Sequence, residues 1–490
     1  MSNITSSDSE LSSFISNLPY TYKVSNKSVD IISDYNKYEG KNVSMAGRVM
    51  AVRKAGKLLF VDILDQYGKM QCYFDYNKMG EELFKSAKSL NAGDIIGVEG
   101  IIFKTKPGEI SINVDTFNQL SKAIKNLPDK WKGLMDVESR YRKRYLDLIV
   151  NPQVREIFIK RSLIIKLIRE FLESHKYTEF ETPVIQPLYG GADSEPFRVF
   201  VNTLNEEDYL RISNELYLKR LIIGGYERIY EIYKAFRNED LDTTHSPEFT
   251  MLEAYMAYAD YNDMMSLNEN MFNKIAKHLF GGEEFEYQGK KISFKIPFAR
   301  VSYADEISKH IGKDVMKLTD DELFAIAEQH GVRFDKGKRT RAHAYDKLFS
   351  NLVQPNLIQP TFAIDFPRET SPLTRPKRGN STLTERFELY ICGIELSNAY
   401  SELNNPIIQR ENFRMEEEKA ALGDKEAEPL DNEFVEAMEY RMPPTGGIGI
   451  GIDRLTMILT NQSSIKEVIM FPMEKRHSSN QKQKDNKSNQ

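Results

Sequence analysis

The sequence predicts an α+β protein with a small β-barrel near the N-terminus and a larger domain in which helices flank an antiparallel sheet. Three observations support this fold class. Residues 43–118 contain five short strands of alternating hydrophobicity that are separated by turn residues. Residues 233–255 alternate in the same way on both sides of a polar loop. Residues 445–459 place a glycine-rich strand directly before an apolar helix.

Length and composition agree with an enzyme of about three domains. The chain has 490 residues, of which 40% are hydrophobic, enough for substantial cores. Its formal charge is −5, from 67 basic and 72 acidic residues. This charge argues against indiscriminate nucleic-acid binding but permits local basic patches. Two cysteines exclude a disulfide scaffold and a thiolate zinc site, and the seven histidines form no HExxH pair.

The sequence shows no membrane or secretion signal. No apolar run approaches the roughly 18 residues needed to cross a membrane, and the first residues are polar. We therefore expect a cytoplasmic protein without membrane contact. The expected segments are an N-terminal extension (1–42) with a short helix at Leu11–Ile15, the barrel (43–118), a linker (119–149), the larger domain (150–474) and a disordered tail (475–490).

The barrel region predicts an OB-fold. We expect strands at 44–53, 58–64, 70–76, 95–104 and 109–114, with a helix at 78–90 between the third and the fourth. Such barrels bind single-stranded nucleic acid by stacking bases on aromatic side chains. Phe60 alternates with Leu59 and Val61, which favours a place on the wetter face, with the barrel core as the alternative.

The linker carries a basic cluster at Arg140–Arg144. Arginine and lysine are the usual contacts to nucleic-acid phosphates, so this cluster is compatible with backbone binding. A solvated helix face that pairs with nearby acids explains it equally well.

The first informative segment of the larger domain is the strand pair around a polar loop at 240–247. By the two-residue period of a strand, Arg237 and Glu239 share a face. Phe249, Glu253 and Tyr255 share a face in the second strand. An arginine with carboxylates behind it suits a ligand that has an acidic and a cationic part. Charges on a solvated sheet face are the alternative.

The second informative segment is an apolar strand pair at 386–402 that contains carboxylates. Buried carboxylates without partners are costly, so they need metal ions, arginines or a ligand ammonium. Asn398, Tyr400 and Glu402 share one strand face, whereas Glu395 falls on the other. Both groups can face one pocket only if a bulge lies between 395 and 398.

The third informative segment has glycine at every second position from 447 to 451 and continues into Asp453 and Arg454. Glycine packs nothing in a strand, so such a row indicates close approach of a ligand or another backbone. A guanidinium in the first helical turn can stack on a heteroaromatic ring or bind phosphate, which favours a nucleotide. The spacing is not that of a dinucleotide site. A packing strand before a buried helix is the alternative.

Together these segments resemble motifs 2 and 3 of the class II aminoacyl-tRNA synthetases. The helix expected at 155–175 and the following Thr178–Pro183 resemble motif 1, which forms the dimer interface in that family. Within the family, the lysyl branch is the most similar over residues 40–475. Its further matches are Tyr145–Leu148, Gly190–Ala192, Glu215–Arg220, Ser371–Leu373 and Asn398–Glu402.

The resemblance implies a class II antiparallel catalytic domain over 150–474 and a homodimer. It also implies the reaction: L-lysine and ATP give lysyl-adenylate, and lysine passes to the 3′-terminal ribose of tRNA(Lys), with release of AMP and pyrophosphate. Positioning and charge neutralisation would supply the acceleration, without a protein nucleophile. Mg²⁺ would accompany ATP, with oxygen ligands shared between protein and phosphates.

The resemblance also assigns residues by position. The catalytic residues would be Arg237, Glu239 and Arg454. ATP would contact Arg237, Glu239, His245, Phe249, Glu388, Gly451 and Arg454, with adenine between Phe249 and Arg454. Lysine would contact Gly191, Glu215, Glu253, Tyr255, Asn398, Tyr400 and Glu402. Glu388 and Glu395 would hold Mg²⁺. In the barrel, Phe60, Gln71 and Glu109 would read the central anticodon base, with Arg53 nearby.

The acidic character of the predicted lysine pocket suits a side chain that ends in an ammonium. A pocket for aspartate would need arginine or lysine instead, whereas arginine as substrate is not excluded by charge. Two other functions remain open. A related enzyme that attaches lysine to a protein usually lacks the anticodon barrel. An inactive RNA-binding paralogue would be expected to lose Arg237, Glu388 or Arg454, and all three are present.

Overall fold

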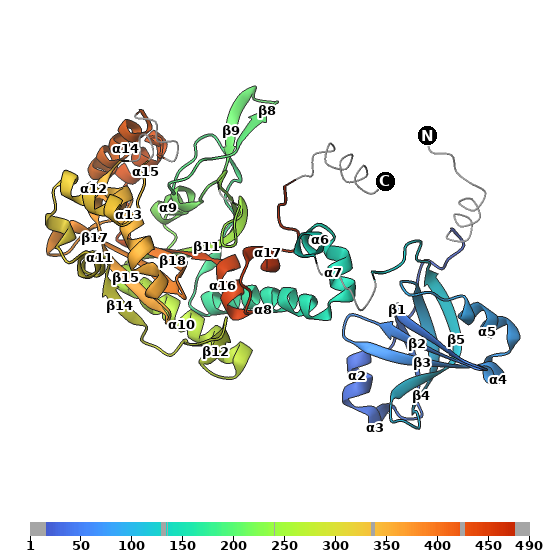
Figure 1. The fold of residues 1–490 in the computed structure, drawn as a ribbon. Coiled ribbons are helices and arrows are strands. Elements are labelled where there is room, and N and C mark those ends of the chain that lie inside the picture. Colours follow the sequence, from blue (N-terminus) through green and yellow to red (C-terminus); the bar gives the residue numbers. More distant parts are fainter. Residues whose placement is uncertain are drawn as a thin grey trace, which may run out of the picture. The chain divides into compact units, whose positions relative to one another are not determined.

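A computed structural model describes residues 16–128, 134, 136–239, 241–334, 339–421 and 427–475. The chain forms two compact units, residues 1–136 and 137–490, each with its own core (Figure 1). The helix predicted at Leu11–Ile15 and almost all of the tail predicted at 475–490 lie outside the described residues. No described helix is long and apolar enough to cross a membrane.

The first unit is a closed five-stranded barrel in the order β1-β2-β3-β5-β4, as predicted for an OB-fold. Its elements are α2 (Ser28–Ser33), α3 (Tyr35–Tyr38), β1 (Asn42–Ala55), β2 (Leu58–Leu64), β3 (Lys69–Asp75), α4 (Tyr76–Met79), α5 (Glu81–Lys88), β4 (Ile95–Lys104) and β5 (Ile110–Ser121). The predicted helix between the third and fourth strands is interrupted at Gly80, which has a φ of +79°.

The face on which Phe60 lies follows from the alternation along β2. Leu59, Val61 and Ile63 are fully buried in the barrel core, whereas Phe60 is only half-buried on the outer face. Its ring makes an edge contact with Tyr73, at 5.4 Å between centroids. The prediction that Phe60 occupies the wetter face is confirmed, and a place in the core is excluded.

The second unit begins with helices that carry the basic cluster, α6 (Val137–Arg142) and α7 (Arg144–Val150). Arg144 is fully buried; it donates to Asp147 at 2.6 Å and to the carbonyls of Lys466 and Met470. Arg140 pairs with Asp147 and Glu467. Both arginines therefore attach these helices to the end of the same unit. Pairing with nearby acids was one of the two sequence interpretations and is confirmed for Arg140, whereas the burial of Arg144 was in neither.

The centre of the second unit is a nine-stranded, mostly antiparallel sheet in the order β14-β15-β17-β18-β19-β11-β10-β6, with β16 paired to β17. Its strands are β6 (Thr178–Glu179), β10 (Arg228–Phe236), β11 (Glu248–Ala257), β14 (Ala299–Ser302), β15 (Thr361–Pro367), β16 (Pro376–Lys377), β17 (Asn380–Ile391), β18 (Ile394–Ser401) and β19 (Thr445–Gly451). With the barrel, this sheet confirms the predicted α+β fold class.

Two small sheets and a set of helices surround the central sheet. The small sheets join β7 (Ile185–Gln186), β8 (Arg198–Val201) and β9 (Glu206–Leu210), and β12 (Glu284–Tyr287) and β13 (Lys290–Ser293). The helices are α8 (Pro152–Ser174), α9 (Glu215–Ile223), α10 (Tyr261–Phe280), α11 (Tyr303–Ile311), α12 (Asp320–Gln329), α13 (Arg341–Leu352), α14 (Pro406–Ala421), α15 (Asn432–Glu439), α16 (Ile452–Leu459) and α17 (Ile465–Val468), with short 3-10 turns at Val315–Lys317, Gln354–Asn356 and Arg368–Thr370.

Alternation along the strands gives the central sheet two chemically different faces. Helices α8, α10 and α16 pack one face and form the main apolar core with side chains such as Leu252, Ala254 and Ile450. Residues of opposite parity, such as Glu253 and Tyr255, project from the other face. A site built on that face therefore rests on a rigid apolar layer.

Candidate active site

A cavity of about 420 Å³ opens on the second face of the central sheet. Every predicted catalytic, lysine, ATP and metal residue lines it, although these residues come from segments up to 263 positions apart (191 to 454). They are Gly191, Glu215, Arg237, Glu239, His245, Phe249, Glu253, Tyr255, Glu388, Glu395, Asn398, Tyr400, Glu402, Gly451 and Arg454. The order of the strands brings them together, because β18, β19, β11 and β10 are neighbours.

The predicted bulge is present in β18. Leu389 of β17 pairs with Ser397, but the next residue, Tyr390, pairs with Glu395, so Leu396 is the extra residue. The bulge reverses the alternation, and Glu395 consequently lines the same cavity as Asn398 and Glu402. The sequence argument that required a break between 395 and 398 is confirmed.

The glycines of β19 differ in what a side chain at each position would meet. A Cβ at Gly447 would overlap Glu402 Oε1 and the Tyr255 ring. Protein packing therefore explains this glycine, because it gives space to two pocket residues. At Gly451 a Cβ would meet the Arg454 side chain only at 3.8 Å, an ordinary contact. Packing within the protein does not require glycine at that position.

One end of the cavity is rich in carboxylates. Glu253 is 6% exposed and accepts hydrogen bonds from Ser213, Tyr233 and Tyr255 at 2.7–3.0 Å. Burial, together with the neighbouring Glu215 carboxylate, raises its pKa to about 7 against the lowering effect of these hydrogen bonds. The two tyrosine hydroxyls come from β10 and β11, the same strands that carry the predicted motif 2.

A buried cation stands between the other two carboxylates of this end. Lys219 Nζ is 2.5 Å from Glu215 Oε1 and 2.5 Å from Glu402 Oε2. Burial raises the pKa of Glu402 to about 8, and Lys219 opposes that rise. The expectation that buried carboxylates here need cations is met by the protein itself. The sequence argument expected lysine or arginine only in a pocket for an acidic substrate. It therefore did not predict a lysine that pairs with the pocket glutamates.

The opposite end of the cavity holds Arg237. Its guanidinium lies 5.2 Å from the centre of the Phe249 ring, and its Nε is buried without a hydrogen-bond partner among the described residues. β10 ends at Phe236, so Arg237 and Glu239 lie beyond the strand. The shared-face argument from strand period was therefore wrong, although both residues reach the cavity. Glu239 accepts from Ser194 and from the backbone N–H of Glu195.

Arg454 contacts the loop between β10 and β11. It donates to the carbonyl of Thr244 and to the carbonyl and carboxylate of Glu395, and lies 2.9 Å from His245 Nε2. These contacts fix its guanidinium at the cavity wall. The cation that lies on Phe249 is Arg237, so an adenine sandwich of Phe249 and Arg454 stays a prediction.

The predicted metal pair combines a buried and an accessible carboxylate. The Glu388 side chain is 11% exposed, and Arg386 Nη2 donates to it at 2.5 Å, with Tyr390 as a second donor. The Glu395 side chain is 38% exposed and lies 3.4 Å from Arg454. In the described part of the chain, no three histidine, cysteine, aspartate or glutamate side chains gather as a metal site. Two carboxylates fit a hard cation whose remaining ligands come from phosphate and water.

Arg386 and Lys219 are among the charged residues in or beside the site that sequence reasoning missed, together with the lining residues Asp193, Glu428 and Asp453. Arg386 lines the cavity and donates to Thr370, Ser371 and Asn398 as well as Glu388. Its position two residues before Glu388 puts both on one strand face, a signal that was available. Lys219 lies four residues after Glu215 on α9, a helical spacing that also allows pairing.

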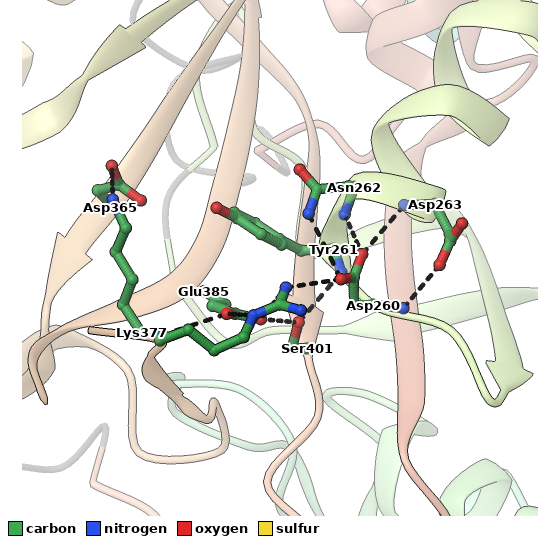
Figure 2. A network of polar contacts seen from close by, with 9 residues as sticks. Asp260, Tyr261, Asn262, Asp263, Asp365, Lys377, Glu385 and Ser401 are labelled. Carbon is green, nitrogen blue, oxygen red and sulfur yellow. Dashed lines mark hydrogen bonds and ion pairs between the residues drawn. The ribbon is translucent and has the colours of Figure 1, made fainter. Parts of the chain in front are cut away.

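A second polar network holds the strands from the opposite face (Figure 2). Glu385, adjacent to Arg386, accepts from Arg378 and from Ser401 at 2.5 and 2.6 Å. Ser401 lies between Tyr400 and Glu402 and accepts from the backbone of Tyr261, at the start of α10. Arg378 also donates to the helix cap Asp260. The strands that carry the pocket residues are therefore fixed from behind by charged contacts.

The residues predicted to read the anticodon lie together on the outer face of the barrel. Arg53 pairs with Phe60 across β1 and β2, and Gln71 pairs with Asp62 across β2 and β3. Arg53 binds Asp62 with two hydrogen bonds of 2.9 Å. Glu109 lies 3.9 Å from Lys69, which also pairs with Asp62. The face therefore offers an aromatic ring beside an amide and charged groups, the combination that base recognition needs.

Comparisons with known proteins agree with this site. A family model described as "tRNA synthetases class II (D, K and N)" matches residues 136–475, and one described as "OB-fold nucleic acid binding domain" matches residues 43–120. The first match covers more than half of the chain, so the chain belongs to the class II tRNA synthetases. This confirms the resemblance.

Curated relatives place the chain beside one branch of this family. It is similar to lysine–tRNA ligases of Clostridium novyi, 48% identical over 92% of this chain and 89% of the relative, and of Clostridium botulinum Loch Maree, 48% identical over 94% and 92%. The lysine–tRNA ligase of Clostridium tetani is 48% identical over 91% and 89%.

Proposed function

We propose that this chain is a lysine–tRNA ligase that activates L-lysine with ATP and transfers it to the 3′-terminal ribose of tRNA(Lys). The observation that carries this conclusion is one cavity with two chemically opposite ends. Glu215, Glu253 and Glu402 form an acidic end that suits the two ammonium groups of lysine. Arg237 and Arg454 form a basic end that suits ATP phosphates.

The activation step needs the lysine carboxylate and the α-phosphate of ATP side by side. Arg237 lines the same cavity as the acidic end, so its guanidinium can donate to both groups and neutralise charge as the bond to phosphorus forms. Phe249 supports the guanidinium and offers its ring to the adenine. Attack of the carboxylate oxygen on phosphorus expels pyrophosphate and leaves lysyl-adenylate. The ribose hydroxyl of the tRNA then attacks the carbonyl carbon, the bond from that carbon to the phosphate oxygen breaks, and AMP leaves.

Mg²⁺ would be held by Glu388 and Glu395 together with ATP phosphates, and would supply charge neutralisation at the phosphates. Arg386 and Tyr390 orient the Glu388 carboxylate from the protein side. Glu239 and His245 would contact the nucleotide from the loop between β10 and β11. Gly191 would allow close approach to lysine, and Gly451 close approach to the nucleotide.

We further propose a cytoplasmic homodimer. Helix α8 and the edge strand β6 correspond to the motif that forms dimers in this family. Exposed apolar side chains in and near this region, Ile159, Val184 and Ile185, support an interface there. The anticodon of tRNA(Lys) would bind the barrel through Arg53, Phe60, Gln71 and Glu109. A protein-lysylating enzyme is disfavoured by the presence of this barrel.

The decisive experiment is ATP–pyrophosphate exchange with each of the twenty amino acids. Lysine is expected to support fast exchange, because the acidic end of the cavity matches its ammonium groups and disfavours acidic side chains. Exchange with aspartate or asparagine above that with lysine would reject the proposal. A heat-inactivated sample of the same preparation serves as the control.

Phe60→Ala is expected to leave pyrophosphate exchange intact and to reduce aminoacylation of tRNA. Stacking on one base is worth roughly 1–3 kcal/mol, so the KM for tRNA should rise by about fivefold to a hundredfold. Tyr67→Ala, at an exposed aromatic residue in the turn after β2, is the matched control. Equal loss in both assays would show that Phe60 supports the barrel rather than the anticodon.

A further inference from the structure

Lys219 occupies an unusual place behind the acidic end of the cavity. It is fully buried on α9 and does not line the cavity, whereas both of its partners, Glu215 and Glu402, do. Burying an ammonium is costly unless charged partners compensate for the lost hydration. Packing alone would favour an apolar residue at this position. The presence of a lysine therefore indicates a role in its effect on the two carboxylates.

The effect of Lys219 is to engage one oxygen of each carboxylate. Its Nζ contacts Glu215 Oε1 and Glu402 Oε2. Neither oxygen of the buried Glu402 carboxylate has a hydrogen-bond partner of good geometry among the described residues, so Lys219 holds Oε2 as an ion pair and leaves Oε1 without a partner. Glu253 has hydrogen-bond donors on both oxygens, Ser213 and Tyr233 on Oε1 and Tyr255 on Oε2. None of these three glutamates therefore presents a free pair of oxygens.

Ammonium and guanidinium groups differ in what they need from such a wall. An alkyl ammonium is a compact charge whose three donors can each take a single oxygen from a different group. A guanidinium is a planar fork that pairs best with both oxygens of one carboxylate. A guanidinium in this cavity would bury N–H groups without partners, which is costly. The charges of lysine and arginine side chains are equal, so charge alone does not separate them, whereas this geometry does.

We propose that Lys219 is a specificity-determining positioning residue, which engages Glu215 and Glu402 from behind so that the cavity accepts an alkyl ammonium and rejects a guanidinium. The proposal rests on the proposed use of lysine as substrate. Lys219 would act partly by excluding arginine, because it occupies carboxylate oxygens that a guanidinium would need as acceptors.

The test compares ATP–pyrophosphate exchange with lysine and with arginine in the variant Lys219→Met. This substitution keeps an unbranched side chain, one heavy atom shorter, and removes its charge. We expect kcat/KM for lysine to fall and kcat/KM for arginine to rise, so that the lysine-to-arginine ratio drops by about tenfold or more. Lys234→Met is the control: this lysine on β10 is 41% exposed and pairs with Glu248, and its loss should leave the ratio unchanged.

A pH profile separates positioning from a general effect on folding. Burial holds the pKa of Glu402 at about 8 against the lowering effect of Lys219, and Glu215, Glu253, Tyr255 and Tyr400 are the other titratable groups around it. Without Lys219, Glu402 should keep its proton to higher pH. The KM for lysine in Lys219→Met should then fall more steeply between about pH 7 and about pH 9 than in the unchanged protein.

Lys219→Met leaves two buried carboxylates facing each other and is open to misfolding. The double variant Lys219→Met/Glu215→Gln removes one charge of each sign and tests the same point in a balanced pocket. A folded variant that keeps the original lysine-to-arginine ratio and pH profile overturns the inference, and so does an equal loss with both amino acids. Failure of the unchanged protein to use lysine would instead reject the proposed function.

Discussion

Replacing Arg237 with methionine is expected to slow lysine-dependent ATP–pyrophosphate exchange by roughly 10²–10³-fold, the usual effect of removing one donor that stabilises a developing negative charge. Arg237 has the geometry for that role, because its guanidinium rests on Phe249 and its buried Nε has no hydrogen-bond partner among the residues that the structure describes. An anion that enters the cavity can supply the acceptor that this donor lacks.

The measurement is kcat for exchange, together with the melting temperature without substrates. Arg237→Lys serves as the matched variant, because it keeps the charge but loses the planar fork, and it should recover only part of the rate. The melting temperature of Arg237→Met should change little, since few contacts within the protein are lost. Full activity in a folded Arg237→Met protein would exclude a role for this guanidinium in the chemical step.

The second large effect is expected for Glu388→Gln. The substitution keeps size but removes a hard, charged oxygen ligand, so exchange should fall by about one to two orders of magnitude and require more Mg²⁺. The variant also leaves Arg386 without its buried carboxylate, at 2.5 Å in the structure. The free energy of unfolding should therefore fall, by up to roughly 3 kcal/mol.

This stability effect reverses a simpler expectation. A buried carboxylate that lacked its cation would stabilise the protein when neutralised, but Arg386 already supplies a cation to Glu388. Glu395→Gln is the matched control, because Glu395 is the more exposed member of the pair. It should raise the Mg²⁺ requirement with little change in melting temperature. An unaltered Mg²⁺ requirement in both variants would contradict the metal role.

Local periodicity accounts for how much of the fold could be predicted. The bounds of β2 and β4 agree with the predicted strands at 58–64 and 95–104, because turn residues flank clear alternation. The bulge in β18 could be predicted because the parity of Glu395 conflicted with that of Asn398. The position of a residue along a strand determines the face to which its side chain points. A conflict between two such positions can therefore be found in the sequence alone.

Partnerships between distant residues could not be predicted in the same way. Glu402 lies 183 positions after Lys219 (402 − 219), and nothing in either segment shows that they meet. The burial of Arg144 against α17 is a second case, since the basic cluster looks solvated in the sequence. The predicted end of β10 was also wrong. A polar residue such as Arg237 continues the alternating sequence pattern whether or not the strand continues.

The bulge at Leu396 has a consequence for how this strand can change over evolutionary time. Because one extra residue reverses the parity of β18, losing or gaining a single residue there would exchange the residues that face the cavity with those that face the apolar core. Charged groups such as Glu402 would then enter the core. Related enzymes should therefore vary in β18 by substitution, and single-residue insertions or deletions should be confined to the segments that flank it.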